Sequence, residues 1–218
     1  MTDNQPARRT YRGETAAQRA QDRRRRLIDA AVEVFGTRGY RVATVDEVCT
    51  QAGLSKRYFY ESFTDAEALL LACYEKCAQD IHTDMVAAVV DAPPSMDEQL
   101  RAALTGYFCA IEADQRRARI TLLEILGVSP AVDAAYTAQT HLFAASVQAL
   151  APAAFGSADD SDGRLHLIAQ GIIGAVTTLA RIWLLDEVAR PRAELVDAAY
   201  ALVNAVLDDL SGHTAGAG

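Results

Sequence analysis

The chain has 218 residues, of which half are hydrophobic and 23% are charged, with only 13 glycines and 6 prolines. This composition supplies a sizeable core, so it excludes a disordered chain, a collagen-like repeat and a small disulfide-rich scaffold. The net charge of -8 argues against a nucleic-acid partner, but residues 1–63 hold 12 Lys and Arg against 8 Asp and Glu. The remainder is strongly acidic. This asymmetry indicates a basic contact region on an acidic body, unless the basic segment is only a solvated tail.

The N-terminus shows no secretory signal, because the first 26 residues hold eight arginines and no apolar run. The cysteines at 49, 73, 77 and 109 are unevenly spaced, which favours reduced thiols over a disulfide framework. The uncharged run Leu165–Ala180 is shorter than the ~20 residues that a membrane span needs. We therefore expect a cytoplasmic protein without membrane contact.

Apolar residues recur at helical spacing along the chain, and no stretch alternates as a half-buried strand does, so the pattern predicts an all-α protein. Capping-box sequences place helix starts at Thr44, with Glu47 three residues later, and at Thr64, with Glu67. Loop-forming residues at 91–95 and 156–163 separate the later elements. The predicted helices are 16–36, 44–52, 56–63, 64–90, 96–113, 115–127, 130–151, 164–188 and 192–210.

Residues 44–63 have helix-turn-helix spacing, because two short helices are joined by the tight turn Ala52-Gly53-Leu54-Ser55. Apolar residues of both helices are spaced to form a small core against Leu27–Phe35. Polar side chains then lie near the exposed N-terminal part of the second helix, at Ser55, Lys56, Arg57, Tyr58 and Tyr60. Such a helix end suits the major groove of DNA, because amides and cations hold phosphates and arginine can fork onto guanine.

With these motifs the sequence resembles the TetR (tetracycline-repressor-like) family of transcriptional regulators. The resemblance covers about Leu27–Leu71 and rests on Ala30-Ala31, Phe35, Gly39-Tyr40, Thr44-Val45, Ala52-Gly53-Leu54-Ser55-Lys56, Phe59-Tyr60, Phe63 and Glu67-Ala68-Leu69-Leu70. It implies a DNA-binding domain of three helices with Lys56–Phe63 as the recognition helix. It also implies that Lys56 and Tyr60 touch the DNA backbone and that Thr44 contacts a phosphate.

The sequence departs from the family pattern at Arg57, Tyr58, Ser62 and Thr64, which affects the operator sequence and not the class of protein. Residues 1–15 form a basic arm that cannot bury enough apolar surface to fold alone. The arm either lies on phosphates or in a narrow minor groove, or it is a solvated tail. The candidate DNA contacts are Thr44, Ser55, Lys56, Arg57, Tyr58, Tyr60 and Thr64, with Arg8, Arg9 and Arg12 of the arm.

Beyond residue 90 the resemblance implies architecture only: an effector-binding helical bundle whose last two helices form a homodimer interface. Small residues in the apolar run Leu165–Ala180 support close helix packing there, although a core helix within one monomer would show the same pattern. The predicted interface residues are Gly171, Gly174, Ala175, Thr178, Leu202 and Val206. The predicted effector-binding residues are Tyr107, Ile111, Tyr136, Phe143 and Trp183, with plain core packing as the alternative.

The sequence contains no glycine-rich phosphate loop, nucleophile elbow or zinc-binding H-E-x-x-H helix, so we expect no catalytic residues, no cofactor and no metal site. Cys73 and Cys77 lie one helical turn apart, but two ligands favour buried thiols over zinc. The chain is thus divided into an arm (1–15), a helix-turn-helix DNA-binding domain (16–66) and an effector-binding and dimerisation domain (67–218).

The leading hypothesis is a homodimeric repressor of transcription that a small-molecule effector releases from a palindromic operator in double-stranded DNA. The effector would act by changing the spacing of the two recognition helices. The alternative is a helical ligand carrier or interaction protein whose basic region binds an acidic partner. A salt-dependent shift on a palindromic duplex distinguishes the two.

Overall fold

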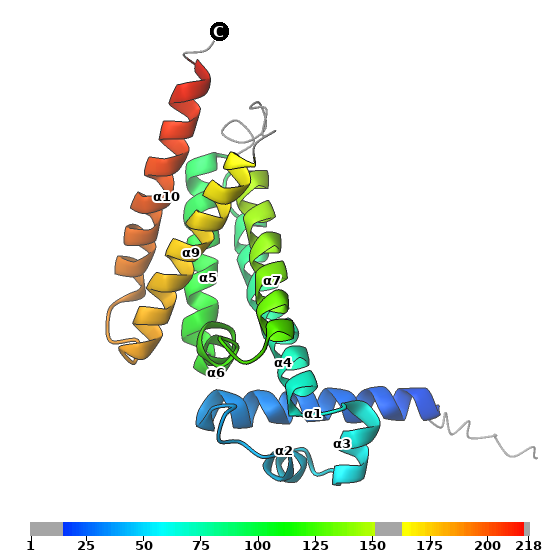
Figure 1. The fold of residues 1–218 in the computed structure, drawn as a ribbon. Helices are drawn as coiled ribbons and strands as arrows, with labels where there is room; N and C mark the ends of the chain where they lie inside the picture. Colours follow the sequence, from blue (N-terminus) through cyan, green and yellow to red (C-terminus); the bar gives the residue numbers. More distant parts are fainter. Residues whose placement is uncertain (1–14, 151–162, 216–218) are drawn as a thin grey trace, which may run out of the picture.

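The computed structural model describes residues 15–150 and 163–215, and within these ranges all regular structure is helical, as the sequence predicted. The N-terminal unit comprises α1 (Ala16–Arg38), α2 (Val45–Ala52) and α3 (Lys56–Ser62). In Figure 1, α1 lies across one end of the molecule with α2 and α3 on its outer side, and α4 (Ala66–Val90) leads from this unit into the bundle.

The bundle is completed by α5 (Met96–Ala113), α6 (Gln115–Arg119), the π-helix η1 (Ile120–Glu124), α7 (Pro130–Leu150), α9 (Arg164–Leu185) and α10 (Arg192–Ala215). Figure 1 shows α5, α7 and α9 running along the bundle, with α10 at its outer edge and α6 at the end nearest α1. Two apolar cores result. One lies among α4, α5, α9 and α10, and the other lies beneath the N-terminal unit.

Local sequence accounts for several helix starts. Thr44 accepts a hydrogen bond from the Glu47 amide, and the Glu47 carboxylate accepts one from the Thr44 amide, which confirms the predicted capping box. Ser95 caps α5, whose bounds match the prediction. The prediction that Thr64 caps α4 is wrong. Asp65 holds that position, and its carboxylate accepts from the Ala68 amide at 2.8 Å.

Two other predictions need correction. The single helix predicted at 115–127 is divided into α6 and η1, where the Ile125 amide donates to the Ile120 carbonyl five residues back. The helix predicted to reach residue 188 ends at Leu185, because Glu187 and Val188 both adopt positive φ. The Val188 amide then donates to the Trp183 carbonyl, which closes the end of α9.

The N-terminal unit is joined closely to the bundle along α1 and α6. A Cβ at Gly36 would lie 2.7 Å from the Arg116 Cα, so only glycine lets the two helices approach this closely. Arg116 pairs with Glu33 of α1. The N-terminal core also includes the first half of α4, together with Ile120, Ile125 and Val132 of the bundle, so it extends past the predicted boundary at residue 66.

Candidate nucleic-acid interface and effector cavity

The turn between α2 and α3 is fixed by Gly53. This glycine has φ +62°, in the left-handed region that glycine adopts at little cost. Its amide donates to the Thr50 carbonyl at 3.1 Å, and the Leu54 amide donates to the Cys49 carbonyl at 2.9 Å. These two bonds give the last carbonyl groups of α2 their hydrogen-bond donors. The turn between α2 and α3 is therefore only a few residues long.

Buried aromatic side chains determine which face of α3 is exposed. Phe59 is fully buried and Phe63 is 5% exposed, and both pack in one core with Leu27, Phe35 and Val48. Burying side chains of this size stabilises the domain by about 1.5–3 kcal/mol each. The opposite face of α3 is therefore held toward solvent as part of a rigid unit.

The exposed face of α3 carries the predicted recognition residues. The Arg57 side chain is 84% exposed, Tyr60 is 61% exposed, and Ser55 begins the helix without a side-chain capping bond. Lys56 and Arg57 are held by acidic neighbours: Lys56 Nζ lies 2.8 Å from Asp46 Oδ2, and Arg57 Nε donates to Glu61 Oε1 at 3.0 Å. Tyr58 is 38% exposed beneath the Arg23 guanidinium.

The two predicted threonine contacts are also exposed. Thr44 lies at the start of α2, and its hydroxyl takes part in the capping box with Glu47. The Thr64 hydroxyl donates to Asp65 Oδ2 at 3.3 Å, just after α3. Both lie on the N-terminal unit, together with the α3 residues. Arg8, Arg9 and Arg12 of the predicted arm lie outside the described residues.

Sequence reasoning missed the role of the arginines in α1. The Arg24 guanidinium stacks on Phe63 and donates to the Ser62 carbonyl at 3.2 Å, while Arg26 donates to the Ala52 carbonyl at 2.7 Å. These contacts secure the ends of α2 and α3 against α1. The run of four arginines is therefore partly structural, and no local signal distinguishes these two from their neighbours.

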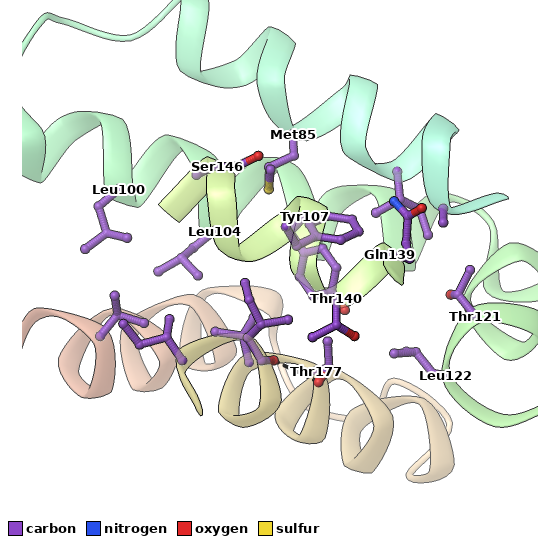
Figure 2. A pocket seen from close by; sticks show the side chains of 18 of the residues that line it. Met85, Leu100, Leu104, Tyr107, Thr121, Leu122, Gln139, Thr140, Ser146 and Thr177 are labelled. Atoms are coloured by element: carbon purple, nitrogen blue, oxygen red, sulfur yellow. Dashed lines mark hydrogen bonds between the residues drawn. The ribbon is translucent and has the colours of Figure 1, made fainter. Parts of the chain in front are cut away.

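A cavity that is partly open to solvent lies among α4, α5, η1, α7, α9 and α10, with a volume of ≈ 100 Å³. One water needs roughly 10–15 Å³ on this scale, so the cavity is large enough for part of a small molecule. Its wall is mainly aliphatic, with Leu100, Leu104 and Leu122 among the side chains in Figure 2. Thr121 and Leu122 reach it from η1.

Three of the predicted effector residues line the cavity: Tyr107, Tyr136 and Phe143. The other two do not. Ile111 is fully buried in the core, and Trp183 packs edge-on against Phe108 while its indole N–H donates to the Arg190 carbonyl at 2.9 Å. Trp183 thus secures the turn between α9 and α10, which its spacing in the sequence did not reveal.

The residues predicted for the dimer interface lie on the outer surface of α9 and α10. Gly171, Gly174, Thr178 and Leu202 are exposed, and Ala175 and Val206 are partly covered. Leu167, Ile182 and Leu185 continue the same apolar surface of α9, at 66%, 51% and 62% exposure. By length and composition α9 could also cross a membrane, but its opposite face packs in the bundle core through Ile172, Val176 and Ala180.

The thiols in α4 are poorly suited to chemistry. Cys73 and Cys77 are fully buried, and burial raises the pKa of Cys77 to about 12 and also raises the pKa of Cys73. The reactive thiolate form is therefore scarce near neutral pH.

The sequence and fold match known regulators of transcription. Residues 27–73 match the family model described as bacterial regulatory proteins, tetR family. The HTH-type transcriptional activator FasR of Mycolicibacterium smegmatis is 29% identical over 167 residues, which are 75% of this chain and 73% of FasR. The fatty acid metabolism regulator protein of Bacillus subtilis is 29% identical over 100 residues, 45% of this chain and 50% of that protein.

Among solved structures, the transcriptional regulator FadR of Bacillus subtilis in complex with stearoyl-CoA aligns with a TM-score of 0.66 at 23% identity, covering 86% of this chain and 97% of that one. This likeness supports the fold. The matched segment holds the turn at Gly53 and the helix that carries Lys56 and Arg57. The chain is therefore a DNA-binding transcriptional regulator and not a ligand carrier, and its helix-turn-helix unit matches the tetR family of bacterial regulatory proteins.

Proposed function

We propose that this regulator acts as a homodimer in the cytoplasm, where it represses transcription from a palindromic operator until an acyl-chain effector enters the bundle cavity. The observation that carries the proposal is the combination of a rigid α3 with exposed Lys56, Arg57 and Tyr60 and a mainly aliphatic cavity in the same chain.

The DNA-binding half of the proposal rests on the exposed face of α3. Arg57 has the most exposed side chain of the three and is suited to fork onto a base, whereas Lys56 and Tyr60 suit phosphate contacts. Thr44, Ser55, Tyr58 and Thr64 complete the proposed surface. A single helix reads only a short half-site, so two copies on a palindrome about one helical turn apart supply the affinity.

The dimer would form through the outer surface of α9 and α10. The apolar side chains there leave a contiguous surface that a monomer would expose to water. A two-fold symmetric pairing of these helices would hold two α3 helices at a fixed separation, so a shift within the bundle would alter that separation and the DNA affinity.

An acyl effector is supported by two observations. The cavity wall consists largely of Leu, Ile, Met and Val side chains, which suit a hydrocarbon chain. One relative is a fatty acid metabolism regulator, and the FadR structure of similar fold contains stearoyl-CoA. Because FasR is an activator, the experiment also tests whether the effector weakens or strengthens binding to DNA.

The experiment is selection of duplexes from a random pool, followed by binding of the selected site with and without a long-chain acyl-CoA. We expect a palindromic site and weaker binding when the acyl-CoA is present. Arg57→Ala should lower affinity by about 1–3 kcal/mol and relax the preference at one position of each half-site. Selection of no palindrome would contradict the dimeric mode of binding, and stronger binding with acyl-CoA would contradict release by the effector.

A further inference from the structure

The cavity is lined by eight polar side chains, and four of them are already satisfied by the backbone of their own helix. The hydroxyls of Thr121, Thr140, Ser146 and Thr177 each donate to a carbonyl three or four residues earlier. The O–H donors of these four groups are therefore used within the helices, so they are not free to donate to a ligand.

The other four are Tyr74, Tyr107, Tyr136 and Gln139, here called the tyrosine–glutamine cluster. Within the described residues, the phenol hydroxyls and the carboxamide of this cluster form no hydrogen bond with another side chain or with the backbone. Tyr74 is 4% exposed and Tyr107 is 7% exposed, so both are more than nine-tenths buried and still line the cavity. Among the described residues, the buried side-chain atoms without a hydrogen-bond partner are Arg23 Nε and Arg117 Nε. The hydroxyl oxygens of Tyr74 and Tyr107 are not among them, so these hydroxyls open into the cavity, where a ligand can reach them.

The members of the cluster lie close to one another. The ring centroids of Tyr74 and Tyr136 are 6.4 Å apart, and burial, with the neighbouring hydroxyls of Tyr136 and Tyr74, raises the pKa of Tyr107. Burial raises the pKa of Tyr74 as well. These phenols therefore stay protonated at physiological pH and act as hydrogen-bond donors.

Charge is absent from the cavity wall: no lining side chain among the described residues is Asp, Glu, Lys, Arg or His. An ionised carboxylate placed here would lose its hydration without gaining a cation, which is costly. A carbonyl oxygen of an ester or thioester carries no net charge and needs only the donors that the cluster supplies.

We propose that the tyrosine–glutamine cluster binds the uncharged carbonyl of an acyl ester or thioester, so that the protein distinguishes such acyl derivatives from free fatty acids. The proposal deepens the acyl-effector function and rests on it. Figure 2 shows Gln139, Thr121 and Leu122 toward one end of the cavity and Leu100 toward the other. The hydrocarbon chain would thus extend toward Leu100, with its carbonyl near η1.

The test is calorimetric titration of the full-length protein at about pH 8, where a fatty acid is ionised, with methyl dodecanoate, dodecanoate and dodecane as probes. We expect the ester to bind at least about tenfold more tightly than the carboxylate. Tyr107→Phe removes only a hydroxyl, so it should weaken ester binding about five- to tenfold and leave dodecane binding unchanged.

Gln139→Leu is a second variant, because Gln139 is only partly buried and its replacement keeps the size of the side chain. Tyr200→Phe is the matched control, since Tyr200 lies on α10 outside the cavity and bonds to Asp97. Equal binding of ester and carboxylate would overturn the proposal, as would unchanged ester affinity in both cavity variants.

The outcomes also separate this proposal from the function on which it rests. Selective ester binding without any change in DNA affinity would leave the cluster as an acyl site but refute the acyl effector. Failure of all three probes to bind would overturn both. Release of DNA by the carboxylate as readily as by the ester would preserve the acyl effector and refute the selectivity.

Discussion

The carboxylate of Glu124 accepts a hydrogen bond from the backbone amide of Tyr40 at 2.8 Å, across 84 residues of sequence. Its other oxygen accepts from Arg119 Nε, also at 2.8 Å, and the Glu124 side chain is only 10% exposed. Glu124 is the last residue of η1, and the same short π-helix supplies Thr121 and Leu122 to the cavity wall. One turn of helix therefore contacts both the effector cavity and the loop that leads into the helix-turn-helix.

We expect Glu124→Ala to reduce the coupling between effector and DNA. A ligand displacing Thr121 or Leu122 moves η1, and without the carboxylate this movement is no longer transmitted to Tyr40. The ratio of DNA affinities without and with ligand should fall by about fivefold or more, within the usual range of coupling energies. Fluorescence anisotropy of labelled operator measures this ratio.

The control for this variant is Glu112→Ala, because Glu112 pairs with Arg192 on the surface of the bundle, between α5 and α10. It should leave the ratio unchanged. Denaturant unfolding of Glu124→Ala should show a loss of about 1 kcal/mol, because the partly buried Tyr40 amide and Arg119 guanidinium lose their acceptor. An unchanged affinity ratio would show that η1 does not couple the cavity to the DNA-binding unit.

The Lys56–Asp46 ion pair predicts a gain of DNA affinity on removal of the acid. Asp46 holds Lys56 by a hydrogen bond that raises the pKa of the lysine, and it also places negative charge beside the proposed phosphate contacts. Asp46→Asn should therefore bind every duplex more tightly, most clearly at low salt, where exposed charges are least screened. The matched control Asp208→Asn, on α10, should have no effect, and weaker binding by Asp46→Asn would contradict the proposed position of Lys56.

The proposed dimer is tested by Gly174→Asp. A side chain at Gly174 meets nothing within 4 Å in one chain, so the variant should fold normally as a monomer. In a dimer packed through this surface, two buried aspartates would prevent close approach of the helices. Light scattering after size exclusion should show loss of the dimer, while Thr105→Asp on exposed α5 surface should keep it. A dimeric Gly174→Asp variant would place the interface elsewhere.

His82 predicts a pH dependence of stability. Burial lowers the pKa of His82 from 6.5, and its Nε2 lies 3.0 Å from the Ser146 hydroxyl. The unfolded chain therefore takes up this proton at higher pH than the folded chain. The corresponding stability is present above about pH 6.5 and is lost as the pH falls through the folded pKa.

Urea unfolding at several pH values measures this effect. His82→Gln should unfold with a shallower decline in stability below about pH 6.5 than the unaltered protein. If the free energy of unfolding declined equally with pH in the unaltered protein and in His82→Gln, a titratable group other than His82 would dominate the pH dependence.

The sequence by itself determined the features that arise within a few residues. The capping box of Thr44 and Glu47, the left-handed turn at Gly53 and the buried Phe59 all depend on neighbours in one short segment. Their spacing predicted the helix-turn-helix and its exposed face before any tertiary contact was known. The cap at Asp65 was missed because Thr64 and Asp65 are both good capping residues, and the choice depends on where α3 ends.

Tertiary structure alone decided which side chains have partners. Tyr107 and Trp183 looked alike in sequence as aromatic residues at helical spacing, yet one lines a cavity with its hydroxyl unpaired and the other closes the α9–α10 turn. Glu124 carried no signal, because its partner Tyr40 is distant in sequence. Helical periodicity specifies which face of a helix is buried. What that face meets depends on how the other helices pack around it.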